Sequence, residues 1–142
     1  MSYSKKTIGG KVDKLGKGRF KIKKDKAGEE DLDINVVDVG ESDFEAEKLS
    51  LDDLPTQIDP DDPKSPSITW INNFVIKFKN GGPINQSYTV RIPGSSTWKS
   101  QGKSLVLFDG NSHGGKPWLY PSSIVDDTIE LTDGDPAIGK SP

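Results

Sequence analysis

The stretch 68-ITWINNFVIKF-78 alternates with the two-residue period of a β-strand. Its aromatic side chains Trp70, Phe74 and Phe78 fall on even positions, whereas Lys77 falls on the odd side. Successive side chains of a strand point to opposite faces of a sheet, so we expect one face toward a core and the other toward water. The Asn-Asn pair inside the stretch predicts a break or bulge in this strand.

Shorter strands are expected downstream, at residues 88–92, 104–108, 118–120 and 128–131. The run 104–108 is apolar without alternation after its first residue, which is typical of a strand buried on both faces. Clusters of Gly, Pro, Asn and Asp between these runs mark turns, and no helix of ordinary length is predicted. The pattern therefore predicts an all-β fold, with an antiparallel β-sandwich or a small barrel over residues 67–142.

Three of these runs carry a resemblance to known β-modules. They are Phe74-Val75-Ile76-Lys77-Phe78, Tyr88-Thr89-Val90-Arg91 and Val106-Leu107-Phe108-Asp109-Gly110. This succession of strand-like runs is similar to that of immunoglobulin-like and carboxypeptidase-regulatory-like domains. The resemblance implies an immunoglobulin-like sandwich and no particular activity.

Charge is sorted by position upstream of the sandwich. Residues 1–26 carry ten Lys and Arg against two Asp, and residues 27–63 carry fourteen Asp and Glu against one Lys. Residues 64–142 carry eight basic and six acidic residues, so balances of +8, −13 and +2 add to the net charge of −3. Opposite blocks can pair with each other or with an external partner.

Residues 1–66 are expected to form an extended charged arm that precedes the sandwich. Within it, 19–23 and 31–39 alternate as strands, and a turn between them would join a basic limb to an acidic limb in a β-hairpin. The competing expectation is a disordered arm, because its charge is high and its hydrophobicity is low.

The end of the arm is expected to be a linker. Ser50 is a candidate cap for a single helical turn, and four prolines among the acidic residues of 55–66 indicate an extended, polyproline-like spacer. All three Trp lie after this spacer. We therefore place a domain boundary between residues 66 and 67.

The residue types of common catalytic sites are missing or isolated. There is no Cys, and the single His113 lies in a Gly-rich loop without a G-x-S-x-G nucleophile elbow. No nucleotide-binding loop is found. We expect no enzymatic activity and no cofactor.

Asp109 and Asn111 are weak candidates for calcium ligands, because their spacing begins like an EF-hand loop. His113 and Gly115 follow where oxygen ligands are required, and no Glu closes the loop. Solvated turn carboxylates are the favoured account, so no metal site is predicted.

The sequence is compatible with more than one cellular location. The first ten residues lack the apolar stretch of a secretory signal, and no apolar run approaches the ~20 residues that cross a bilayer. We expect a soluble chain without membrane contact, with a cytoplasmic location or a place in a virion or extracellular assembly as the alternatives.

The leading functional hypothesis is a non-enzymatic structural or interaction protein. The arm would bind a protein partner, either another copy of the chain or a larger assembly such as a capsid or filament. The residues expected to make this contact are the cations Lys5, Lys6, Lys11, Lys14, Lys17, Arg19, Lys21, Lys23 and Lys24. Binding of nucleic acid by these cations is not favoured, because the acidic block that follows would compete for them.

The alternative hypothesis is a carbohydrate-binding module. Trp98 lies in a polar run and Trp118 shares one side of a short segment with Tyr120, so these aromatics could form a stacking platform for a polysaccharide. The competing interpretation is that Trp98 folds back over the end of the sandwich and Trp118 fills its core.

Overall fold

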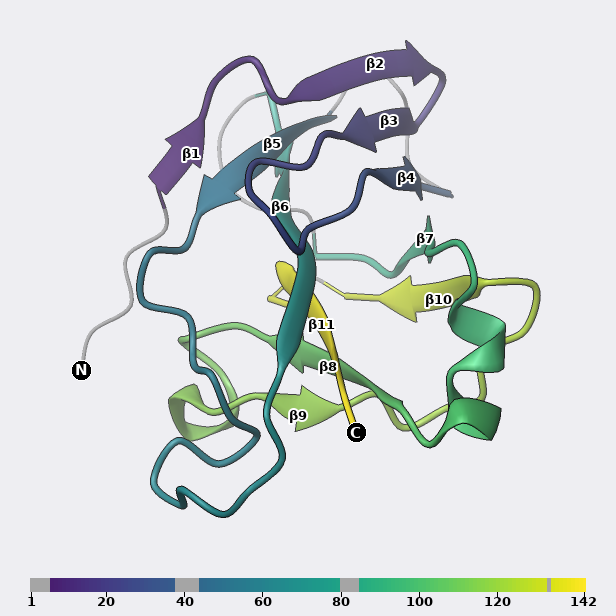
Figure 1. Cartoon of the computed structure of the whole chain (residues 1–142). Helices are drawn as coiled ribbons and strands as arrows, with labels where there is room; N and C mark the ends of the chain where they lie inside the picture. The colour runs from purple at the N-terminus through teal and green to yellow at the C-terminus, as the bar shows by residue number, and fades with distance from the viewer. Residues whose placement is uncertain (1–5, 38–43, 80–84, 133) are drawn as a thin grey trace.

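The computed structural model of this chain describes residues 6–37, 44–79, 85–132 and 134–142. The chain forms two antiparallel sheets with few helical turns, an all-β architecture consistent with a β-sandwich (Figure 1). Within the described residues the sheets do not close into a barrel. This confirms the all-β prediction and the antiparallel pairing.

The six-stranded sheet has the order β1-β5-β6-β11-β8-β9. Its strands are β1 (Lys6–Ile8), β5 (Phe44–Ser50), β6 (Thr69–Phe78), β11 (Ala137–Ser141), β8 (Ser104–Phe108) and β9 (Trp118–Leu119). The five-stranded sheet has the order β10-β7-β4-β3-β2. Its strands are β10 (Thr128–Leu131), β7 (Tyr88–Arg91), β4 (Leu32–Asn35), β3 (Arg19–Ile22) and β2 (Val12–Gly16). Three short 3₁₀ turns are η2 (Ser95–Thr97), η3 (Lys99–Gln101) and η4 (His113–Gly115), and no described helix is long and apolar enough to cross a membrane.

The main core lies between the inner faces of the two sheets. Phe20 on β3 meets Phe44 on β5 edge-on with ring centroids 5.8 Å apart, and Phe74 on β6 meets Tyr88 on β7 at 6.2 Å. All four side chains are buried. Large aromatic areas removed from water in this way supply much of the stability of a small sandwich.

The middle of β6 has the predicted bulge. β11 pairs with β6 through Ile138 and Asn72 and then through Gly139 and Trp70, so the register shifts by one residue. A shift of one residue moves side chains to the opposite face. Ile71 therefore joins Phe74 in the main core, while Trp70 packs in a second cluster with Phe108. The expectation of one continuous apolar face on even positions is wrong for this reason.

The predicted hairpin is present in the five-stranded sheet. β3 and β4 pair antiparallel, with Lys21 opposite Asp33. The turn before β3 requires Gly18, whose φ is +63° and whose added Cβ would lie 2.5 Å from the carbonyl oxygen of Val36. The carbonyl of Gly18 in turn accepts the amide of Val36 at 2.7 Å, which closes the sheet at this corner.

Strands from residues 6–50 belong to both sheets and pair with strands of residues 67–142. β4 pairs with β7, and β5 pairs with β6 along five positions. In Figure 1 the N-terminal strands gather in one half of the molecule, and the long β6 continues from them into the other half. The expected boundary between residues 66 and 67 therefore does not separate two sets of strands, and the described part of the expected arm is built into the sheets.

The segment after β5 differs from the two local predictions made for it. β5 ends at Ser50, residues 52–53 form a turn and no helix, and the hydroxyl of Ser50 donates to the carboxylate of Asp52 at 3.3 Å, so the helical turn capped by Ser50 is wrong. The proline-rich spacer folds back on itself, because Gln57 bridges to Ser67 and its side-chain amide donates to the carbonyl oxygens of Pro63 (2.7 Å) and Ser65 (3.0 Å). The indole of Trp70 donates to the carbonyl of Pro55 at 2.9 Å and fixes this loop, so the extended spacer is also wrong.

Candidate functional site

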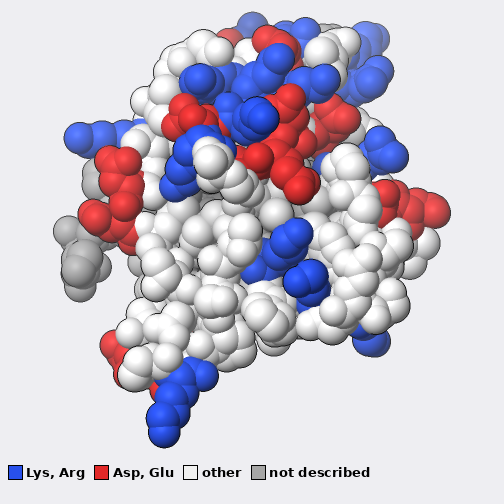
Figure 2. All heavy atoms as spheres, viewed as in Figure 1, with Lys and Arg blue, Asp and Glu red and all other residues white. Residues whose placement is uncertain are grey.

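Charged side chains crowd one half of the molecular surface. Figure 2 shows Lys and Arg intermingled with Asp and Glu over the part of the molecule where β2, β3 and β4 lie in Figure 1. The strand register explains the mixture. One row across the sheet places Asp13 on β2 opposite Lys21 on β3, Lys21 opposite Asp33 on β4, and Asp33 opposite Arg91 on β7.

These side chains alternate in sign from strand to strand, and together with Arg19 we call them the charged sheet face. They alternate along their strands with the buried Phe20, Ile34 and Val90, so they point away from the core. A shallow groove of about 400 Å³ lies over this face, lined by Arg19, Lys21, Asp33 and Arg91 among others. The sorted charges of the sequence are thus partly paired inside one chain.

The predicted arm cations fall into two groups, with Lys5 outside the described residues. Lys11 and Lys23 lie 3.6 Å from Asp25 and Asp13, respectively, in exposed ion pairs. The backbone amide of Lys24 donates to Asp31 at 2.8 Å; together with nearby lysines, this lowers the pKa of that carboxyl.

The second group of arm cations points to solvent. Lys14, Lys17 and Arg19 are exposed and have no ion pair within the described part of the chain. Lys6 is exposed on the edge strand β1, and Lys21 lies within the charged sheet face. The structure therefore brings most of the predicted cations to one end of the molecule but does not present them on a separate arm.

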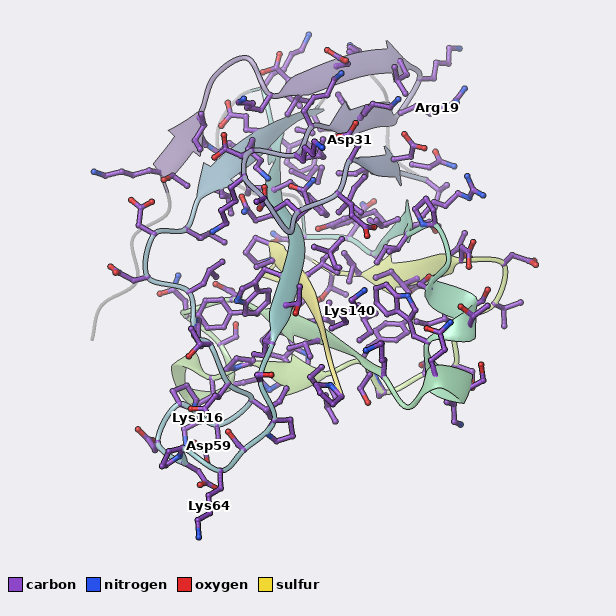
Figure 3. All side chains as sticks on the ribbon, viewed as in Figure 1. Arg19, Asp31, Asp59, Lys64, Lys116 and Lys140 are labelled. Atoms are coloured by element: carbon purple, nitrogen blue, oxygen red, sulfur yellow. The ribbon has the colours of Figure 1, made fainter. Side chains whose placement is uncertain are left out.

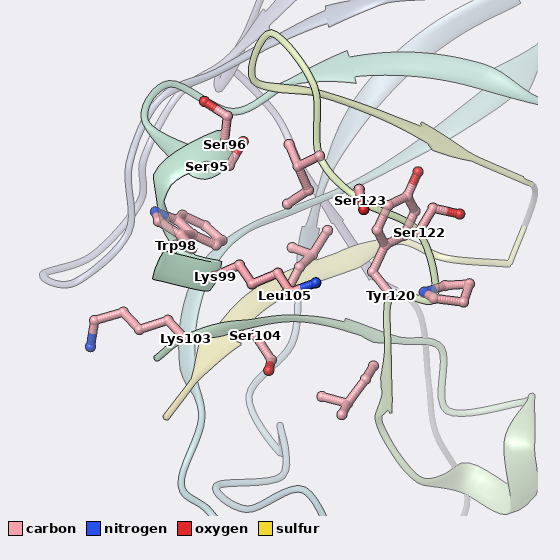
Figure 4. Close-up of a pocket in the computed structure, with 13 residues that line it drawn as sticks. Ser95, Ser96, Trp98, Lys99, Lys103, Ser104, Leu105, Tyr120, Ser122 and Ser123 are labelled. Carbon is pink, nitrogen blue, oxygen red and sulfur yellow. The ribbon is translucent and has the colours of Figure 1, made fainter. Parts of the chain in front are cut away.

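A pocket of about 310 Å³ opens at a different place, and we call it the Trp98 pocket (Figure 4). It lies between the η2–η3 turns, the start of β8 and the segment that follows β9. Its lining combines two lysines, several serines, two aromatic rings and short apolar side chains, and contains no carboxylate.

Asp127 holds the η2 wall of this pocket. Its carboxylate accepts the backbone amides of Gly94 and Ser96, each at 2.9 Å, and the hydroxyl of Ser96 at 2.6 Å. Hydrogen bonds to the charged form favour ionisation. The hydroxyl and amide of Ser96 and the amide of Gly94 accordingly lower the pKa of Asp127 to about 2.

Two of the three predicted stacking residues line the Trp98 pocket. Trp98 is only 6% exposed and belongs to the main core, with the ammonium of Lys140 5.3 Å from its ring centroid. Tyr120 packs against the core, and its hydroxyl accepts the amide of Glu130 at 3.1 Å, which ties the segment after β9 to β10. Trp98 thus folds back over the core, as the competing interpretation held, and meets the pocket with a small part of its ring.

Trp118 does not line the pocket with the other two. It stacks on His113, with ring centroids 3.8 Å apart and planes inclined by 23°. His113 is exposed and has a φ of +51°, in the left-handed region. The three aromatics therefore do not form one platform.

Asp109 is buried, and its carboxylate is used within its own turn. It accepts the amide of Asn111 and the hydroxyl of Ser112, each at 3.2 Å. Asn111 itself is exposed. Among the described residues there is no group of three or more His, Cys, Asp or Glu side chains placed to hold a metal ion.

Sequence reasoning missed a buried polar cluster around Lys48 on β5. The Lys48 ammonium is fully buried and donates to Glu29 at 2.9 Å and to the side-chain oxygen of Asn72. Asn73 donates to the second oxygen of Glu29 at 3.1 Å, and Asn72 donates to the carbonyl of Ile22 at 3.0 Å. Burial lowers the pKa of Lys48, and the hydrogen bond and charge of Glu29 oppose that shift.

No protein-family model, curated protein or solved structure matches this chain.

Proposed function

We propose that this chain is a non-enzymatic interaction protein, an immunoglobulin-like β-sandwich that assembles with copies of itself through its charged N-terminal half. The observation that carries the proposal is the charged sheet face, where Lys21, Asp33 and Arg91 alternate across neighbouring strands and no described element covers them. Neighbouring strands lie about 4.8 Å apart. A second copy that is turned over and displaced by one strand can therefore set each cation against an anion.

Exposed cations beside this face strengthen the argument for a partner. Lys17 and Arg19 are exposed and have no ion pair within the described chain, and Glu30 and Asp31 of the acidic block are exposed as well. Opposite charges on two copies accelerate association and fix its register more than they add affinity. The assembly is thus expected to be reversible and sensitive to salt. Capsids, filaments and surface layers are the kinds of structure that such contacts build.

Light scattering after size exclusion tests the proposal. At about 0.05 M salt the particle mass should exceed that of the monomer, and at about 0.5 M salt it should fall, because the screening length shortens to a few ångströms. A monomer at both salt concentrations and at all protein concentrations would overturn the proposal.

Charge-reversal variants locate the contact. Variant A carries Lys17→Glu and Arg19→Glu, and variant B carries Asp13→Lys and Asp33→Lys. Each variant alone should be monomeric because like charges then face each other, and an equimolar mixture should associate again. Lys64→Glu is the control, because Lys64 extends from the loop between β5 and β6 at the far end of the molecule from Arg19 (Figure 3). If variant A alone assembled to the same extent as the Lys64→Glu control, the charged sheet face would not be the contact between copies.

A second arm of the experiment tests nucleic acid. Duplex DNA is added to the parent chain and to variant A at low salt. Binding by the parent that A loses would assign the exposed cations to phosphate contacts and would count against self-assembly as their role.

A further inference from the structure

We propose that the Trp98 pocket binds a single acidic sugar unit of a saccharide, with the sugar carboxylate against the ammonium of Lys99. This inference concerns a site separate from the charged sheet face and goes beyond the assembly proposed above. It rests on the charge, the hydrogen-bonding groups and the size of the pocket.

The charge of the lining selects an anion. Lys99 and Lys103 line the pocket, and none of its lining residues is Asp or Glu. The nearest carboxylate described at its wall, Asp127, faces the backbone of Gly94 and Ser96 and is held there by three hydrogen bonds. A carboxylate on the ligand would therefore meet an ammonium donor and no opposing charge, and such charge-assisted hydrogen bonds are the strong ones.

The two lysines are placed differently. In Figure 4 the side chain of Lys99 runs across the pocket from η3 toward Tyr120, whereas Lys103 extends away from it. Lys99 is the cation that a bound ligand would contact. Lys103 supplies a matched control on the same rim.

The remaining lining suits a sugar ring better than a purely apolar ligand. Ser104, Ser122 and Ser123 are among the lining residues, and a serine hydroxyl is both a donor and an acceptor, like the hydroxyls of a sugar. Trp98, Leu105, Tyr120 and Ile124 add apolar area for the ring C–H groups.

The buried hydroxyl of Ser95 is a second observation in favour of a polar ligand at this pocket. It is 2% exposed, and its hydroxyl has no hydrogen-bond partner among the described residues. A buried hydroxyl without a partner is unfavourable, and such groups in native proteins call for an explanation. This hydroxyl oxygen is covered in the free chain, so a ligand hydroxyl would become its partner only when the η2 wall shifts on binding.

The volume sets the size of the ligand. About 310 Å³ is at the small end of the range of roughly 300–1,000 Å³ for ligand pockets. One sugar ring fits this space, and the rest of a longer chain would extend into solvent.

Calorimetric titration of the full chain tests the proposal, with trigalacturonic acid as the acidic probe and galactotriose as the neutral one. The acidic probe should bind at least about tenfold more tightly than the neutral one, since the Lys99 contact requires the carboxylate. Lys99→Met keeps the aliphatic stem and should weaken acidic binding by about tenfold, while Lys103→Met should change it less than about twofold. Equal affinities for the two probes, equal effects of the two variants, or no binding of either probe would overturn the proposal.

Ser95→Ala separates a ligand-binding role from a structural one. It removes a hydroxyl that has no partner, so the free protein should be as stable as the parent or slightly more so, while acidic-probe affinity should fall. Loss of stability without loss of affinity would contradict the role given to Ser95. Hexaglutamate is the last probe, and binding as tight as that of trigalacturonic acid would show a general anion site instead of a saccharide site.

Discussion

At the scale of single residues, Asp127 shows how one side chain sets both local stability and the shape of a site. Its carboxylate accepts three hydrogen bonds from Gly94 and Ser96, and its pKa lies at about 2 in the folded chain against an ordinary value of 3.8. A carboxyl whose pKa is lower in the folded state contributes stability above its unfolded pKa and loses that contribution as the pH falls through the folded value. The stabilisation by Asp127 is therefore complete above 3.8 and disappears as the pH falls toward about 2.

Asp127→Asn tests this residue-scale prediction. The variant should be less stable than the parent at neutral pH, because an amide lacks the charge and one of the acceptor oxygens. The difference in free energy of unfolding, measured by urea denaturation at several pH values, should shrink as the pH falls from 3.8 toward about 2. Asp126→Asn is the control, since it changes the neighbouring exposed carboxylate. A difference between Asp127→Asn and the parent that does not vary with pH in this window would show that the carboxylate is not responsible.

At the scale of elements, β5 buries a charge inside the sandwich. The side chains of Lys48 and Glu29 are 0% and 1% exposed, and each is bonded to an asparagine of β6 as well as to the other. Removing one member of a buried pair leaves an uncompensated charge, which costs about 3–5 kcal/mol. Lys48→Met should therefore destabilise the fold by about that amount, as measured by urea denaturation.

An ion pair between β5 and β6 is the matched control. Lys77 and Glu47 lie 3.0 Å apart but are 42% and 36% exposed, so Lys77→Met should cost only about 0–1 kcal/mol. The double variant Lys48→Met with Glu29→Gln should recover a large part of the loss, because an amide replaces the unpaired carboxylate. Equal losses from Lys48→Met and Lys77→Met would contradict the role given to burial.

The same strand shows what the sequence can and cannot reveal. Strands such as β8 and β10 are predictable, because β8 is a short continuous apolar run, β10 alternates with the period of a strand, and turns bound both. β5 is not, because Lys48 occupies an inward position next to Leu49 and the alternation is lost. Its partner Glu29 is 19 residues away and becomes close because the amide of Glu30 donates to the carbonyl of Ile71 on β6 (2.8 Å), while β6 pairs with β5. The Trp98 pocket also joins segments whose proximity depends on the turn held by Asp127, so no local pattern signals it.

At the scale of the whole molecule, we expect the N-terminal half to be required for the fold of the rest, because strands of both halves pair in both sheets. Residues 67–142 alone would lack β5 beside β6 and β4 beside β7, together with the inner aromatic pair of Phe20 and Phe44. The exposed strand edges and the missing half of the core leave too little burial to offset the entropy of ordering the chain. We expect the amide protons of this fragment to show the narrow chemical-shift dispersion of a random coil, and we expect no cooperative unfolding transition. As the control, a protease site inserted after Lys64 should allow the full chain to be cut while it stays folded, because both halves remain paired. A fragment 67–142 that unfolds cooperatively by itself would restore the boundary that the sequence predicts.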